Sequence, residues 1–436
     1  MIRKRIISAI SGNVLVQAIN AVIQVAGIPL LLKYWGIHYY GEWLILFTIP
    51  SYIGMSDMGL GSSTTSELSI LVQAGEETEA KEILRNTFWF ILLIGGIPFL
   101  LLALSVFVLP WYDWLNFTSI VEGDFKLAFI LLILYIYLAL FLTLPLGYYR
   151  VQKIYHRERY ISSFFRVLEF LLIVAAVMAD GMIVVVALIY LLVRLVQFIF
   201  VLFDLTLKFK DFRLLPFGFN FKKISYLLKP GLSAMTIYMG QNLLIQGLVS
   251  IIGIALGSVQ VVLFSTTRTL VNMVKQVVGI INLSITSEFS YAYGDRNMPL
   301  LRKLFRITNR GNTLMAFLML ALLYFLGHWI FRIWTGGKVD ILEPFFLLFL
   351  ISTLFSAVWN VHLVLLVATN RLGYSGILFL INAFLLIVLN AIWIKSWGLT
   401  GVAVSILLFE LAMWLIMMRT TRGVLQDGVL KPRLLL

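Results

Sequence analysis

The chain has 436 residues, of which 61% are hydrophobic and only 13% are charged, and its formal net charge is +13. Soluble domains contain about 45–50% apolar residues, so this composition excludes a water-soluble globular protein and indicates one that lies in lipid. The lack of cysteine excludes disulfides and thiolate metal sites.

Segments long and apolar enough to cross a membrane occur throughout the chain, because a spanning helix needs about 20 mostly apolar residues. The first follows a basic N-terminus, but its apolar run extends to Leu32 without a clear cleavage site, which favours a retained span over a signal peptide. We therefore expect an all-α polytopic membrane protein with about twelve transmembrane helices, since helices satisfy their own backbone hydrogen bonds in lipid. The predicted spans are 9–32, 43–60, 87–109, 127–149, 161–179, 182–206, 231–255, 259–283, 311–333, 344–368, 375–394 and 400–418.

The positions of lysine and arginine predict the orientation. With the N-terminus inside, 25 of the 34 basic residues fall in cytoplasmic loops and termini, and five fall in outer loops. Both termini are then cytoplasmic. The positive net charge is explained by this bias and gives no reason to expect nucleic acid as a partner.

A weak internal repeat divides the chain. The phrase "TSELS" at 65–69 returns 221 residues later as "TSEFS" at 286–290, and the same shift places Gly36 on Gly257. Each phrase closes a predicted span, the second and the eighth. We therefore predict two six-helix lobes, 1–220 and 221–436, related by an axis along the membrane normal, as in some transporters.

One face of the predicted eighth span is polar. Arg268, Asn272, Lys275 and Asn282 recur at helical spacing. Charged groups at membrane depth are costly and usually face a cavity or a partner. A water-filled lumen that binds substrate is the simplest environment for this face.

The first span carries an uncharged polar face made of Asn13, Gln17, Asn20 and Gln24. Amides offer donors and acceptors that suit sugar hydroxyls, but they also join helices to one another. Both interpretations stay open, with lumen lining ahead.

Further ionisable residues lie in other spans. Arg194 of the sixth span is near mid-depth, whereas Arg166 of the fifth can reach the cytoplasmic surface or pair with Glu169. Asp57 and Glu410 are acids within the second and twelfth spans. Asp57, Glu169 and Glu410 are candidates for ion coupling, and each could instead be a fixed counter-ion.

Two stretches carry a resemblance to a known family. "YYGEWLILFTIPSYIGMSDMGLG" at 39–61 and "SEFSYAYGDRNMPLLRKLFR" at 287–306 resemble polysaccharide (Wzx-type) flippases of the multidrug/oligosaccharidyl-lipid/polysaccharide exporter superfamily, such as O-antigen and capsule repeat-unit flippases. The resemblance covers nearly the whole chain and implies a two-lobed helical fold with alternating access. It implies a polyprenyl-pyrophosphate-linked oligosaccharide as substrate, other polysaccharide-assembly proteins as partners, and a bacterial cytoplasmic membrane as location.

The leading hypothesis is therefore a flippase, in which Arg194, Arg268 and Lys275 hold anionic groups of the substrate. A cation-coupled multidrug exporter of the same superfamily is the alternative, although the first span has no carboxylate. A membrane polymerase or ligase is disfavoured, because the outer loops are short and have no clustered acid or histidine. No cofactor is expected beyond H⁺ or Na⁺ coupling, and membrane lipids surround the protein.

Overall fold

A computed structural model describes residues 2–54, 60–93, 96–209, 212, 220–221, 224–369, 371–372 and 374–426. Every regular element in these residues is helical, which confirms the predicted all-α fold. Nine helical stretches of the described chain have the length and hydropathy of a membrane span. The chain is thus a multi-pass membrane protein, while the number of twelve crossings and the cytoplasmic termini stay predictions.

Several predicted spans join into longer helices. α1 (Ile2–Ile53) and α14 (Ser375–Gln426) each hold two predicted spans. Non-helical backbone angles at Gly36 and Gly398 break these helices internally. A single glycine with positive φ can kink the chain without a longer loop. Two spans that hydropathy predicts as separate helices are therefore joined here through one non-helical residue.

The chain divides into two compact units, Met1–Tyr238 and Met239–Leu436. The division falls inside α9 (Ser225–Asn242), whereas the sequence repeat divides the chain before that helix. We call these parts unit 1 and unit 2.

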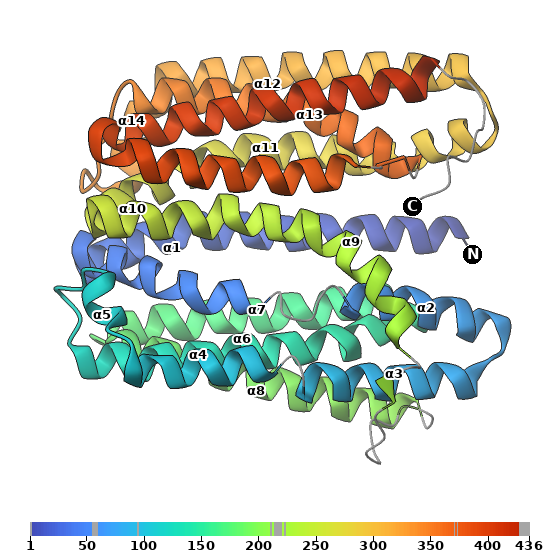
Figure 1. Ribbon diagram of the computed structural model, residues 1–436, viewed down its shortest axis with the longest axis horizontal. Helices are drawn as coiled ribbons and strands as arrows, with labels where there is room; N and C mark the ends of the chain where they lie inside the picture. The colour runs from blue at the N-terminus through green and yellow to red at the C-terminus, as the bar shows by residue number, and fades with distance from the viewer. Residues whose placement is uncertain are drawn as a thin grey trace. The chain divides into compact units, whose positions relative to one another are not determined.

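Unit 1 is built around α6 (Glu122–Val151), which packs against six other helices of the unit (Figure 1). Half of its most apolar stretch is buried, as expected for a helix that is hydrophobic on all sides. The helices around it are α1, α2 (Leu60–Ala74), α3 (Glu77–Leu93), α4 (Gly96–Val108), α7 (Tyr155–Met178) and α8 (Ile183–Lys208).

Unit 2 has the same kind of centre. α13 (Phe345–Ala368) packs against α11 (Ser258–Gly294), α12 (Met298–Thr335) and α14, and 56% of its most apolar stretch is buried. α10 (Leu248–Leu256) packs against α11 and α14. A π-helical turn at Leu243–Gly247 precedes α10.

The repeat seen in the sequence extends to the backbone. α2 is followed by Gly75 with φ 82°, and α11 is followed by Arg296 with φ 56° at the equivalent position. The next helices begin at Glu77 and Met298, again 221 residues apart. The two phrases thus sit near the ends of helices that stop in the same way, as the sequence indicated.

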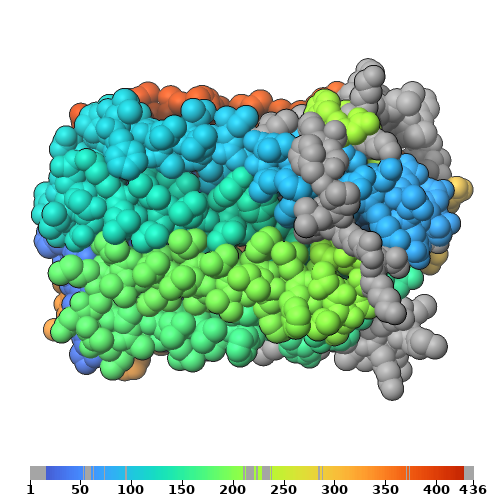
Figure 2. All heavy atoms as spheres, turned by 90° about the horizontal axis from the view of Figure 1, so that it is seen from below, coloured from blue at the N-terminus to red at the C-terminus, as the bar shows by residue number. Residues whose placement is uncertain are grey.

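The exterior of the units is rich in large apolar side chains. Figure 2 shows the face of unit 1 that includes α4 in cyan and α8 in green. Leu100, Leu104 and Phe107 of α4 are more than half exposed, as are Ile199 and Phe203 of α8. Such continuous apolar surface is typical of contact with lipid tails rather than with water.

Candidate functional site

Arg194 is the centre of a buried polar network in unit 1. Its terminal nitrogens donate to Gln197 Oε1 and to the Tyr135 hydroxyl, both at 2.8 Å. Glu169 of α7 lies 3.8 Å from the same guanidinium. Only 22% of the Arg194 side chain and 14% of the Glu169 side chain are exposed. A buried guanidinium requires hydrogen-bond acceptors and a counter-ion around it. For Arg194 these come from α6, α7 and α8.

Aromatic rings enclose this network. The guanidinium carbon of Arg194 lies 4.8 Å from the ring centroid of Tyr135, a favourable position for a cation over a π face. Tyr190 packs on Tyr135 and on Trp43, with centroid distances of 5.1 and 5.9 Å. Tyr190, Arg194 and Gln197 of α8 are therefore packed against other side chains of unit 1.

The structure also places the pair that sequence analysis left open. Glu169 forms its ion pair with Arg194 of α8, while Arg166 is exposed. Spacing along one helix indicated Arg166 as a neighbour of Glu169, but the packing of α7 against α8 supplies a second arginine. Only the tertiary fold distinguishes the two.

In unit 2, Lys275 of α11 and Glu410 of α14 form an ion pair with 3.5 Å between Nζ and Oε1. Trp359 of α13 donates its indole N–H to the other oxygen of Glu410 at 2.5 Å. Glu410 is 6% exposed, whereas 35% of the Lys275 side chain is exposed. The Glu410 carboxylate is thus bound by Lys275 and by Trp359, while the Lys275 ammonium remains partly exposed.

Asn282 lies in a chain of amides. Its Nδ2 donates to Asn360 Oδ1 at 2.9 Å, and its Oδ1 accepts from Asn312 Nδ2 at 2.5 Å. This chain links α11, α12 and α13, and Asn282 is only 3% exposed. An amide with both ends bonded to neighbouring helices acts in helix packing, so its predicted contact with substrate would require that chain to open.

Arg268 of α11 reaches the π-helical turn. Its Nη1 donates to the backbone carbonyl of Ile245 at 3.0 Å, and its guanidinium carbon lies 5.2 Å from the ring centroid of Phe264. A π turn widens the helix and is frequent at functional sites. Arg268 and Asn272, one turn apart on α11, are both partly exposed.

The amides predicted on the first span all lie on α1. Gln17 and Gln24 are exposed, and Asn20 is half-buried. The Oδ1 atom of Asn20 is buried and has no hydrogen-bond partner among the described residues. The side chain of Asn13, like the whole of Asp57, lies outside the described residues.

A charged cluster near the start of α7 was not predicted from the sequence. Arg157 donates to both oxygens of Asp204, at 2.8 Å from Nε and 2.5 Å from Nη2, and the Tyr149 hydroxyl donates at 2.6 Å. Nearby, Arg150 forms a two-bond pair with Glu158 at 2.6 and 2.7 Å. The available signal was Asp204 itself, a single acid on an apolar helix.

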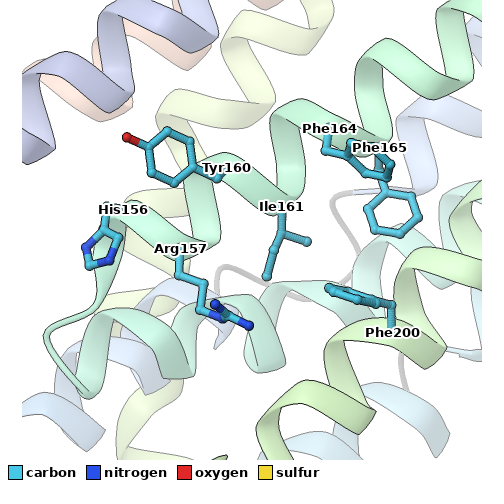
Figure 3. Close-up of a pocket in the computed structure, with 7 residues that line it drawn as sticks. All are labelled: His156, Arg157, Tyr160, Ile161, Phe164, Phe165 and Phe200. Atoms are coloured by element: carbon cyan, nitrogen blue, oxygen red, sulfur yellow. The ribbon is translucent and has the colours of Figure 1, made fainter.

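A hollow of about 330 Å³ lies beside that cluster. Figure 3 shows Arg157 on one side and the rings of Phe165 and Phe200 on the other. Its lining is largely apolar, and Arg157 is already bound by Asp204. The hollow thus offers packing space for a hydrocarbon chain more than a charged binding site.

Glu42, a third carboxylate that the sequence did not single out, holds the loop that follows α5 (Trp111–Trp114). Its Oε1 accepts from Thr118 N, Thr118 Oγ1 and Ser119 N, and its Oε2 accepts from Ile120 N, at 2.8–3.0 Å. The side chain is 1% exposed. One carboxylate thus accepts hydrogen bonds from three consecutive residues of the loop, so its role is to fix the loop.

No family model matches the chain, and no curated protein matches its sequence. Solved structures do match its fold. An inward-facing multidrug resistance MATE family transporter of the MOP superfamily is 16% identical, with a TM-score of 0.71 over 94% of this chain and 98% of that one. The lipid II flippase MurJ in an inward closed conformation is 13% identical, also with a TM-score of 0.71, over 96% and 89%.

A MOP superfamily transporter from Pyrococcus furiosus is 15% identical, with a TM-score of 0.64 over 98% of this chain and 96% of that one. It is described as having a binding pocket of reversed polarity that suggests a different function. The chain thus has the fold of MOP superfamily transporters, a fold shared by a drug exporter and a lipid-linked precursor flippase. All three are described as transporters or flippases.

Proposed function

We propose that this protein is a flippase that moves a lipid-linked oligosaccharide with a pyrophosphate headgroup across the membrane. The observation that carries the proposal is the charge balance of the buried side chains. The four buried carboxylates among the described residues all have partners: Glu42, Glu158, Asp204 and Glu410. A binding site for a cationic substrate needs a carboxylate that is accessible and lacks a partner, because a buried charge must be compensated.

Two basic side chains of α11 are more accessible than these carboxylates. Lys275 is 35% exposed, and Arg268 is partly exposed on the same helix. Guanidinium and ammonium groups bind phosphate oxygens well. In this proposal Arg268 and Lys275 contact the pyrophosphate, while Asn272 between them donates to phosphate or sugar oxygens.

Arg194 has a different proposed role from Arg268 and Lys275 of α11. Its hydrogen bonds to Gln197 and Tyr135 are short, and its ion pair with Glu169 is longer at 3.8 Å. An anionic group that approached would compete with Glu169 first, because that contact is the weakest of the three. Arg194 then binds substrate only in a conformation in which α7 and α8 have separated.

The wider features of the proposal follow from the flippase hypothesis. The amides Gln17, Asn20 and Gln24 contact sugar hydroxyls, the substrate supplies a surface polysaccharide, and the membrane is the bacterial cytoplasmic membrane. Alternating access between the two lobes moves the headgroup, and other polysaccharide-assembly proteins use the product. Coupling to H⁺ or Na⁺ would involve Glu410, Glu169 or Asp57.

A cation-coupled multidrug exporter is the second candidate, and one observation favours it. The Lys275–Glu410 contact of 3.5 Å is longer than a close ion pair. If Lys275 turned away, Glu410 would become an acid near the middle of a predicted span, which is a usual place for a coupling proton or sodium ion.

The test is to delete the gene and determine which leaflet holds the lipid-linked intermediates. Loss of surface polymer with complete repeat units trapped on the inner leaflet supports the flippase. Complete units that reach the outer leaflet but stay unpolymerised would indicate a polymerase instead. Unchanged polymer together with drug sensitivity would favour the exporter.

A further inference from the structure

Four arginines gather at the end of unit 2 where α12 begins and α14 ends. Arg302, Arg306 and Arg310 recur every four residues and so form one stripe along α12. Together with Arg422 of α14 they line a hollow of about 550 Å³. None of its lining residues is acidic. Such a concentration of like charge creates a positive potential that attracts anions.

The known contacts of these arginines leave most of their charge uncompensated. Arg302 donates from Nε to the backbone carbonyl of Leu425 at 2.9 Å, and Arg422 contacts the sulfur of Met418. In the described part of the chain, no ion pair to an acid is formed by Arg302, Arg306, Arg310 or Arg422. Asn309, between the arginines, has a buried Oδ1 with no hydrogen-bond donor in the same part.

An apolar hollow adjoins the arginine hollow. It measures about 580 Å³ and shares Asn309 and Arg310 with the first. Beyond them its walls are Phe317 of α12, Phe355 of α13 and Trp414 of α14, and the last two rings lie 5.7 Å apart. We call the two adjoining hollows together the cavity, which has a cationic end and a hydrocarbon-like end.

The two hollows lie along α12 at the levels expected for the headgroup and the acyl chains of one leaflet. Residues 311–331 contain no Lys, Arg, Asp or Glu, and 21 helical residues extend about 30 Å, the thickness of the hydrocarbon core. Arg310 therefore lies at the boundary between headgroups and tails. Phe317, 54% exposed, then lies at the level of the tails.

We propose that this cavity binds an anionic phospholipid of the surrounding leaflet. The phosphate lies among Arg302, Arg306, Arg310 and Arg422, and one acyl chain lies along Phe317, Phe355 and Trp414. The orphaned Oδ1 of Asn309 accepts from a headgroup hydroxyl, which favours a lipid such as phosphatidylglycerol. The positive-inside pattern of the sequence predicts that this end faces the cytoplasm, where anionic lipids attract basic residues. The proposal is independent of the transported substrate.

The site is tested with purified protein in nanodiscs that contain phosphatidylglycerol and phosphatidylcholine, with retained lipid counted by native mass spectrometry. The wild type is expected to retain phosphatidylglycerol selectively. The Arg306→Gln/Arg310→Gln variant should lose about fivefold of that preference for each arginine removed, or about 25-fold in total. The matched control is Lys303→Gln/Arg419→Gln, which removes two exposed charges that do not line the cavity.

A second variant tests the apolar end. Val358→Trp adds a large ring to the wall of the apolar hollow and should weaken phosphatidylglycerol retention while leaving the arginines intact. Equal retention of both lipids by the wild type, or equal loss in the control pair, would overturn the proposal. So would full displacement of the lipid by glycerol phosphate, which has no acyl chain, or retention unaffected by Val358→Trp.

Discussion

Gly36 and Gly257 lie 221 residues apart in the sequence and have nearly the same backbone conformation, with φ/ψ of 74°/175° and 87°/175°. This region of backbone space is accessible almost only to glycine. Each glycine separates the first two predicted spans of its own half of the sequence. The repeat that relates the two halves of the sequence is therefore also a repeat of backbone conformation at these two breaks.

We predict that Gly36→Ala and Gly257→Ala each destabilise the protein by about 1–3 kcal/mol. No atom lies within 4 Å of the place that an added Cβ would take at either site, so the cost comes from the backbone conformation alone. The measurement is the thermal unfolding midpoint of detergent-purified protein. Gly311→Ala is the control, because it lies within helix α12 and also has open space around it. A midpoint for the two variants equal to that of the control would contradict the prediction.

The Lys275–Glu410 pair should respond asymmetrically to substitution. Lys275→Met leaves a 6%-exposed carboxylate without its counter-ion, which is costly in a buried setting. Glu410→Gln leaves a lysine that is 35% exposed and can turn toward water. We expect Lys275→Met to lower the unfolding midpoint more than Glu410→Gln, and the double variant to recover most of the difference. Equal midpoints for the two single variants would show that the pair does not compensate charge.

Glu42→Gln should loosen the loop that follows α5 (Trp111–Trp114). The new amide nitrogen cannot accept from backbone N–H groups, so one or more of the bonds from Thr118, Ser119 and Ile120 is lost. We expect amide hydrogen exchange at these residues to become about tenfold faster. Glu122→Gln is the control, since Glu122 is an exposed acid of the same region. Unchanged exchange at 118–120 would contradict the assigned role.

Charge reversal at Arg268 tests the α11 face. Arg268→Glu is expected to reduce export of lipid-linked saccharide to background while the protein remains in the membrane, because an acid would repel pyrophosphate. Export is measured as surface polysaccharide, and membrane level by immunoblot. Arg332→Glu makes the same change at an exposed end of α12 and should export normally. Normal export by Arg268→Glu would remove the anionic-substrate hypothesis for this face.

Much of the fold was accessible from the sequence because its cause is local. Composition requires lipid as the solvent, and lipid requires helices, so the apolar runs predict the elements found. The spacing of Arg268, Asn272 and Lys275 likewise predicts one helix face, and all three lie on α11 with partial exposure. Even the equivalence of Gly36 and Gly257 followed from aligning the sequence with itself.

The partners of the charged residues could be decided only by the tertiary structure. Helical spacing suggested Arg166 for Glu169, but the packing of α7 against α8 selects Arg194. Nothing near Lys275 in sequence indicates Glu410, 135 residues away, and Glu42 gives no local sign that it holds residues 118–120. The apolar pattern predicts which segments enter the membrane, because the hydration free energy of each side chain depends mainly on that side chain alone. Charge compensation depends on which helices pack together, and that is a property of the whole fold.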